Sequence, residues 1–131
     1  MRQQFANPIN VRIGQFAAEF VENFRASLGG DPAVPDLSIR SFGYLCLSDT
    51  PALTEVLKRD RAVQAANGAG TRMVSPREIA ALYPFYKLDD IQSGSLNTRD
   101  EGYYNAPLMV EWLIRKSLER GVEYVRSGGC C

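Results

Sequence analysis

Few side chains in this chain have both the type and the spacing that catalysis needs. The sequence contains no histidine, which removes the commonest general base and the histidine-activated serine and cysteine nucleophiles. Two pairs of adjacent carboxylates occur, Asp89-Asp90 and Asp100-Glu101. Adjacent side chains on a turn usually point apart, and no further metal ligand stands near either pair. We therefore interpret both pairs as solvated loops and expect no metal site.

Three other short motifs could contact a ligand. Gly68-Ala69-Gly70 has the spacing of the start of a dinucleotide fingerprint, but a helix is expected before it and a strand after it, which is the reverse of the order that binds a pyrophosphate. Tyr103-Tyr104 could line a pocket or pack at the edge of a core. Arg2, with Gln3 and Gln4, forms a polar cluster whose simplest interpretation is a frayed terminus.

Composition limits the class of protein. The 131 residues are 45% hydrophobic and 23% charged, with 15 basic and 15 acidic side chains. This is an ordinary globular composition, and zero net charge without a basic cluster argues against a nucleic-acid partner. No apolar run approaches the roughly 20 residues needed to span a membrane. The few cysteines, with Cys46 in an apolar stretch, favour a buried reduced thiol and a cytoplasmic location.

Helical periodicity predicts the first element. An apolar stripe at helical spacing predicts a helix over Ile13–Leu28 that Gly29-Gly30 ends. Asn7, Pro8 and Asn10 break up the N-terminal stretch from Met1 to Phe16, which has no signal-peptide h-region. The stripe consists of Ile13, Phe16, Ala17, Phe20, Val21, Phe24 and Leu28.

Alternating and capped patterns predict the middle of the chain. Residues 37–47 are expected to form an interior strand, with Leu45 and Leu47 on one face. Thr50 as N-cap and Pro51 at the first helical position begin a helix that ends at Asn67-Gly68.

A second set of local signals follows. Residues 71–74 are a short strand, and Ser75 with Glu78 forms a capping box that begins a short helix. We expect a strand at 91–97, a helix at 107–118 and a strand at 122–125. Residues 127–131, an irregular tail, match no folded element.

Several motifs, taken in order, resemble one protein family, the FAD-dependent oxidoreductases of the D-amino-acid oxidase, sarcosine oxidase and glycine oxidase type. The resemblance covers about residues 1–126. The motifs that carry it are Arg2-Gln3-Gln4-Phe5, the phenylalanine-rich helix, Phe42-Gly43-Tyr44-Leu45-Cys46-Leu47, Met73-Val74-Ser75-Pro76-Arg77-Glu78-Ile79, Leu82-Tyr83-Pro84, Asp100-Glu101-Gly102-Tyr103-Tyr104-Asn105-Ala106-Pro107 and Arg120-Gly121-Val122-Glu123-Tyr124.

The resemblance implies a fold and a division of the chain. Family members carry a Gly-Gly-x-Arg-Gln-Gln-Phe segment after their N-terminal dinucleotide fingerprint, and Met1 stands at the x position, so we expect an internal fragment that lacks this fingerprint. The implied fold is α/β (α+β), with a mixed sheet and flanking helices, and covers mostly the half by which the chain enters the substrate domain. Residues 1–30 would lie near the flavin, 31–104 in the substrate domain, and 105–126 would form a returning helix and strand.

The resemblance also implies a chemistry. FAD is the expected cofactor of the complete protein, and the reaction is oxidation of a C–N bond of an amino acid or secondary amine by hydride transfer to the flavin. Arg2 matches the arginine that faces the flavin and the substrate carboxylate, and a guanidinium suits that role because it binds carboxylates bidentately. Tyr103 is the second substrate-binding candidate. No covalent flavin link is expected, and no catalytic residue is assigned.

An alternative stays open at this point. The chain could be a free-standing small α/β binding or interaction module without a cofactor. A strand–GxGxxG–helix unit encoded upstream of Met1 would favour the oxidoreductase, and in either case we expect this chain alone to be inactive.

Overall fold

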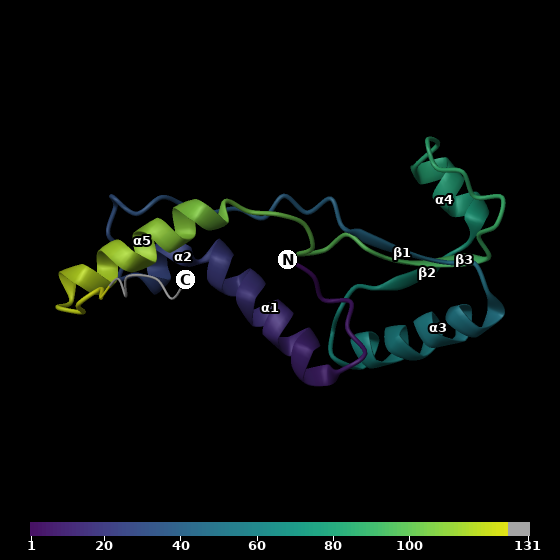
Figure 1. The fold of residues 1–131 in the computed structure, drawn as a ribbon, viewed down its shortest axis with the longest axis horizontal. Coiled ribbons are helices and arrows are strands. Elements are labelled where there is room, and N and C mark those ends of the chain that lie inside the picture. Colours follow the sequence, from purple (N-terminus) through teal and green to yellow (C-terminus); the bar gives the residue numbers. More distant parts are fainter. Residues whose placement is uncertain (126–131) are drawn as a thin grey trace, which may run out of the picture.

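The computed structural model describes residues 1–125 as an elongated molecule with a helical end and a sheet end (Figure 1). The tail at 127–131, with Cys130 and Cys131, lies outside the described residues. Helices and strands alternate along the chain, and the strands form one small sheet, which confirms the α/β fold class. The elements are α1 (Pro8–Glu22), α2 (Phe24–Ser27), β1 (Tyr44–Ser48), α3 (Pro51–Ala66), β2 (Arg72–Val74), α4 (Pro76–Leu82), β3 (Ser93–Asn97) and α5 (Ala106–Glu119).

The sheet has the order β1-β3-β2, and both pairings are antiparallel. Ser95 of β3 lies opposite Cys46 of β1 on one side and Met73 of β2 on the other. Two expectations are therefore corrected: the described sheet is not mixed, and β1 is an edge strand rather than an interior one. Burial of both faces of a strand depends on what packs above and below it, and does not report whether both of its hydrogen-bonding edges are paired.

Local capping residues determine where the two helices that cover this sheet begin. Figure 1 shows α3 on one side of the sheet and α4 on the other. The Leu53 amide donates to the Thr50 hydroxyl at 3.3 Å, as predicted. The capping box of α4 is also confirmed, because the Glu78 amide donates to Ser75 Oγ (3.3 Å) and the Ser75 amide donates to Glu78 Oε2 (2.8 Å). Both helices begin with proline at the first position, where no amide hydrogen is needed.

The first helix differs from the prediction in its bounds and in its buried face. It begins at Pro8, earlier than the expected Ile13, because Asn7 Oδ1 accepts the Ile9 amide (2.9 Å) and caps the helix there. It ends at Glu22, and α2 is a separate turn. Ile13 and Phe16 of the expected stripe are 59% and 69% exposed. The buried face of α1 consists of Val11, Gly14, Ala18 and Val21.

The helical end has a core of its own. Val21, Phe24, Val34 and Leu37 are buried there, and Trp112 of α5 packs against them. The last helix is one residue longer at each end than predicted. The strand expected at 122–125 is absent among the described residues, because a strand needs a hydrogen-bonded neighbour and every residue of this stretch is exposed.

Two extended segments join the helical end to the sheet end. They run side by side between α2 and β1 and between β3 and α5 (Figure 1). The Arg40 amide donates to the Tyr103 carbonyl at 2.8 Å, and this bridge pairs the two segments.

Candidate functional site

The N-terminal segment Met1–Phe5 lies where the two ends of the molecule meet (Figure 1). The Met1 nitrogen donates to the Gly102 carbonyl (2.5 Å), and the Gly102 amide donates back to the Met1 carbonyl (3.1 Å). Position 102 must be glycine, because a Cβ there would lie 1.9 Å from the Arg40 carbonyl oxygen. The start of the described chain is thus paired with a turn about a hundred residues later.

Glu101 holds the next two residues of this segment. Its side chain is fully buried, at 0% exposure. Oε1 accepts the Gln3 amide at 2.5 Å, and Oε2 accepts the Gln4 side-chain amide at 3.1 Å. The interpretation of Asp100-Glu101 as a solvated pair is therefore wrong for Glu101, because its partners come from the far end of the sequence. Asp100 is half-buried and takes a positive φ of 55°, which turns Glu101 inward.

Gln4 links the same segment to the sheet. Its side-chain amide also donates to the Tyr44 carbonyl (2.7 Å), and its Oε1 accepts the Ser95 hydroxyl (3.0 Å). Gln3 is 1% exposed. The frayed terminus that the sequence suggests is therefore wrong, since fraying needs a backbone without partners.

Helix α1 lies against the backbone of Arg2. A Cβ at Gly14 would lie 2.6 Å from the Arg2 carbonyl oxygen, so glycine permits this close approach. The Arg2 side chain is exposed, and its guanidinium carbon lies 4.7 Å from the centre of the Phe5 ring. It borders an open cavity of about 420 Å³ whose other lining residues are Met1, Phe5, Asn10, Ile13, Gly14, Ala17 and Tyr104. This cavity combines one cation with aromatic and aliphatic walls.

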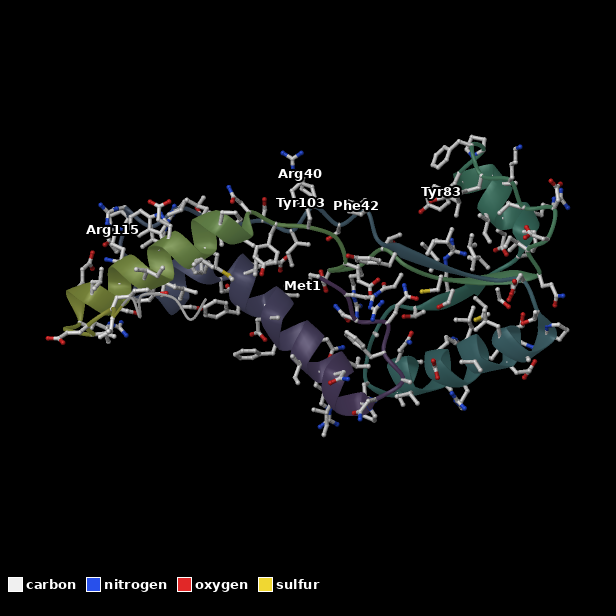
Figure 2. The ribbon with its side chains drawn as sticks, viewed as in Figure 1. Met1, Arg40, Phe42, Tyr83, Tyr103 and Arg115 are labelled. Atoms are coloured by element: carbon white, nitrogen blue, oxygen red, sulfur yellow. The ribbon has the colours of Figure 1, made fainter. Side chains whose placement is uncertain are left out.

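Tyr103 lies in a different place from Arg2. Its ring is 52% exposed, 6.2 Å from the ring of Phe42 and 5.7 Å from the guanidinium carbon of Arg40. Figure 2 shows these three side chains gathered on the connecting segments. Tyr103 lines a second cavity, of about 500 Å³, to which Arg2 does not contribute. Tyr104 lines both cavities, so the two predicted site residues are neighbours across Tyr104 rather than partners in one pocket.

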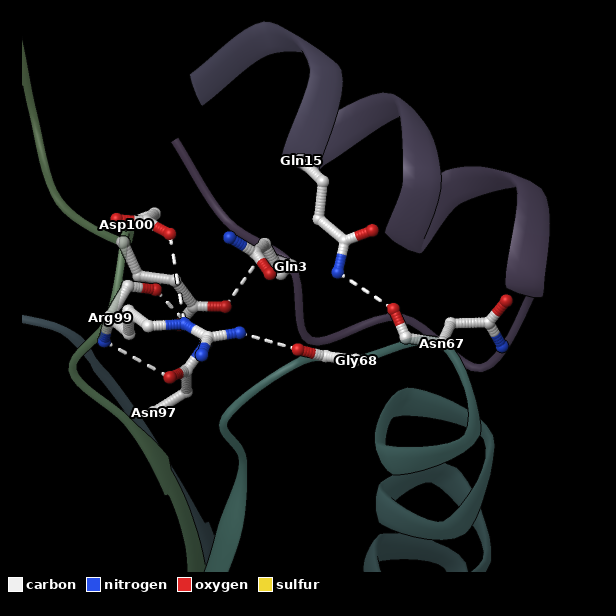
Figure 3. Close-up of polar contacts among 8 residues, drawn as sticks. Gln3, Gln15, Asn67, Gly68, Asn97, Arg99 and Asp100 are labelled. Carbon is white, nitrogen blue, oxygen red and sulfur yellow. Dashed lines mark hydrogen bonds and ion pairs between the residues drawn. The ribbon is translucent and has the colours of Figure 1, made fainter. Parts of the chain in front are cut away.

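The Gly68-Ala69-Gly70 loop has helix α3 before it and strand β2 after it, as the sequence predicts. Figure 3 shows its fixed surroundings: Gln15 Nε2 donates to the Asn67 carbonyl at 2.8 Å, and the Arg99 guanidinium donates to the Gly68 carbonyl. The carbonyl oxygens of Asn67 and Gly68 thus accept from one neutral amide and one guanidinium of the same chain. These bonds tie the end of α3 to α1 and to the turn after β3, and the loop does not have the amide-lined geometry of a phosphate site.

The remaining chemical candidates are structural. Cys46 is a half-buried free thiol, and burial raises its pKa above the ordinary value. Asp89 and Asp90 are exposed, as expected. Within residues 1–125 no group of three or more His, Cys, Asp and Glu side chains could hold a metal ion. No helix of the described part of the chain is both long and apolar enough to cross a membrane.

The sequence predicts Arg2 as a site residue, and this stays a prediction, but it did not point to Glu101 and Gln4, which hold the segment that carries Arg2. The signal for Glu101 was present in the Asp100-Glu101-Gly102 turn, where an acidic residue precedes a glycine. Its burial could not be read from that turn alone, since it depends on Gln3 and Gln4.

Comparison with known proteins adds the family to this geometry. Residues 2–127 match the family described as DAO, FAD dependent oxidoreductase. The chain belongs to this family. Two relatives are the proteins called FAD-dependent oxidoreductase domain-containing protein 1 of Bos taurus, 29% identical over 124 residues, and of Mus musculus, 30% identical over 122 residues. The matches cover 93% and 92% of this chain but 25% of each relative, so the chain spans about a quarter of their length.

Two solved enzymes share the fold. The structure is similar to L-proline dehydrogenase from P. horikoshii, with a TM-score of 0.74 at 23% identity, over 92% of this chain and 30% of that enzyme. It is also similar to glycine oxidase from Bacillus cereus ATCC 14579, with a TM-score of 0.64 at 14% identity, over 88% of this chain and 31% of that enzyme.

Family membership implies FAD as the cofactor of the complete protein. The donor set beside Arg2 fits one part of it: a guanidinium next to an aromatic ring and aliphatic walls suits a planar group with an electron-rich edge. The described residues supply no strand–turn–helix unit with glycines that would hold the pyrophosphate. The donor set thus fits the ring end of the cofactor, and the described residues would not hold the whole of it.

Proposed function

We propose that the complete protein oxidises a C–N bond of an amino acid or secondary amine, with FAD as the electron acceptor. The observation that carries this proposal is the Arg2 guanidinium at the border of a largely apolar cavity, on a backbone held by Glu101 and Gly102. The names of the two similar enzymes, a proline dehydrogenase and a glycine oxidase, support amino-acid substrates.

The chemistry follows from a division of roles. When bound, the flavin supplies the two-electron acceptor that takes a hydride from the carbon next to the nitrogen. Arg2 would bind the substrate carboxylate through two parallel N–H···O bonds. The walls formed by Phe5, Ile13 and Tyr104 would place apolar surface beside that ion pair.

Tyr103 would contact the substrate away from Arg2, because the two residues line different cavities. Because Tyr104 separates its cavity from that of Arg2, Tyr103 would contact a substrate only at the end away from the carboxylate. The free thiol of Cys46 agrees with a reducing compartment, and we place the complete protein in the cytoplasm on that ground.

The test is turnover by the complete protein. L-proline, glycine and sarcosine are added without oxygen, and bleaching of the flavin absorbance is followed. We expect Arg2→Met to lower kcat/KM by about 10- to 100-fold, since it removes charge-assisted hydrogen bonds to the carboxylate. Arg2→Lys should lose less, because it keeps the charge but not the bidentate geometry.

Arg61→Met is the matched control, since Arg61 is an exposed arginine of α3 that lines neither the Arg2 cavity nor the Tyr103 cavity. It should leave kcat/KM unchanged. Equal turnover by the Arg2→Met variant would remove Arg2 from the site. No flavin bleaching with any amine or amino acid would reject the proposed reaction as a whole.

A further inference from the structure

Glu101 is a buried carboxyl group that the proposed reaction does not use. It is 0% exposed, and its two oxygens accept one backbone N–H and one side-chain amide. No arginine or lysine forms an ion pair with it within residues 1–125. Burying a carboxyl group without a cationic partner is unfavourable. The function of this carboxyl group therefore depends on the two groups that it binds, the Gln3 amide and the Gln4 side chain.

The two groups held by Glu101 follow Arg2 directly. The Gln3 amide belongs to the peptide bond that Arg2 begins, and the Gln4 side chain fixes the next residue. On the other side of Arg2, Met1 pairs with Gly102, the neighbour of Glu101. One turn of chain thus holds the residues before and after Arg2, while the Arg2 side chain itself stays exposed.

Helix α1 restricts the Arg2 backbone on a further side. Because Gly14 has no side chain, the helix lies against the Arg2 carbonyl and leaves the backbone no room to shift that way. The guanidinium is then directed along Phe5 at the border of the cavity. A charged group carried by a fixed backbone loses less conformational freedom when it binds an anion.

We propose that Glu101 is a positioning residue, which holds the Arg2 backbone so that the guanidinium faces the carboxylate of the substrate. This inference rests on the proposed function, because it assigns the anion that Arg2 meets. It differs from a purely structural role in one respect: the effect of Glu101 on substrate binding passes through Arg2.

The first experiment measures order without any turnover. In the complete protein, hydrogen exchange of the Gln3 amide should be much slower than that of the exposed Ala6, and Glu101→Gln should speed it up. Glu101→Gln replaces one accepting oxygen with an NH₂ group that cannot accept either bond. Asp100→Asn is the control, because asparagine tolerates the positive φ of the same turn and the substitution leaves Glu101 in place.

The second experiment is a double-mutant cycle on the same protein with L-proline or glycine. Glu101→Gln should raise KM by about tenfold and change kcat little. A tenfold rise corresponds to the free energy of about one lost charge-assisted hydrogen bond. In an Arg2→Met background the same change should have almost no effect on KM. Asp100→Asn should leave both constants unchanged.

Each outcome decides the role of Glu101. Additive losses in the cycle would mean that Glu101 acts on the fold and not through Arg2, which overturns the proposal. Fast exchange of the Gln3 amide in the unmodified protein would overturn it even if the Glu101→Gln variant failed to fold. If no amino acid is turned over, the proposed function fails, while unchanged exchange in Glu101→Gln would separately reject the positioning role.

Discussion

On the side of the sheet covered by α4 the buried side chains are apolar. On the side covered by α3 and the N-terminal segment the buried side chains of β3 are polar. Val74, Ile79 and Leu96 are buried on the first side. On the second, Ser95 and Asn97 are buried in alternate positions of the same strand β3. One strand therefore contributes to two different kinds of core.

The difference lies in how each side obtains its stability. The apolar side gains from removing surface from water, which has no preferred direction and tolerates small shifts. The polar side depends on hydrogen bonds between particular atoms, and several of its buried atoms have no partner within the described residues: both polar atoms of the Gln3 side chain, Gln64 Oε1 and Thr71 Oγ1. The apolar side should dominate stability, and the polar side should determine how the Arg2 segment is placed.

The largest expected loss of stability comes from removing a buried side chain on the apolar side. Ile79→Ala should lower the free energy of unfolding by about 2–5 kcal/mol, through lost burial and the cavity that remains. Leu82→Ala on the same helix is the control, since Leu82 is half exposed, and should cost much less. The measurement is urea denaturation followed by circular dichroism. Equal losses for the two variants would show that α4 does not cover the sheet as described.

A smaller effect is expected on the polar side. Ser95→Ala removes the hydroxyl that donates to Gln4 Oε1 and leaves a buried acceptor without a partner. The expected loss is about 1–3 kcal/mol in the same denaturation experiment. Ser38→Ala, at an exposed position in the connecting segment, should be neutral. A neutral Ser95→Ala would mean that the Ser95 hydroxyl does not hold Gln4.

The smallest effect concerns pH and Cys46, which lies opposite Ser95 in the sheet. Burial is the main cause that raises the pKa of this thiol above 9.0; Glu101 raises it further, while Arg2 opposes the shift. The folded state therefore keeps the proton longer than the unfolded state. The resulting contribution to stability is fully present below about pH 9 and is lost as the pH rises through the folded pKa.

The check compares urea midpoints at neutral and alkaline pH for the parent and for Cys46→Ala. The alkaline decline should be larger in the parent than in the variant. Iodoacetamide should also label Cys46 slowly in the folded protein at neutral pH, because the thiolate is the reactive form. Rapid labelling would contradict the burial of this thiol.

Local signals made part of the fold predictable. The caps at Thr50 and Ser75 join groups that are three residues apart, so the sequence contains both partners of each hydrogen bond. The alternation of Leu45 and Leu47 likewise predicted the apolar side, where both pack beside Leu96. The predictions failed where a partner lies far away in sequence. The burial of Glu101 and the edge position of β1 depend on pairings about 50 to 100 residues apart.

The first helix shows a second reason for failure. Spacing identified an apolar stripe on α1 but could not decide which part of it is buried. Small residues, Gly14 and Ala18, form the contact side, because the backbone of Arg2 needs the space. The larger Ile13 and Phe16 were displaced to the exposed side. Of the candidate site, Arg2 was predictable through its motif, and the support beneath it was not.

The position of Trp112 gives the helical end of the molecule a fluorescence signal of its own. It is the only tryptophan of the sequence, and it packs against the core of the helical end, with the Arg115 guanidinium carbon 4.8 Å from its ring. Its fluorescence therefore reports the environment of the helical end, whereas the far-ultraviolet circular dichroism averages over the whole backbone. If the sheet end loosens first during unfolding, the dichroism changes while the emission of Trp112 stays constant, and the order in which the two cores separate can be followed without any label.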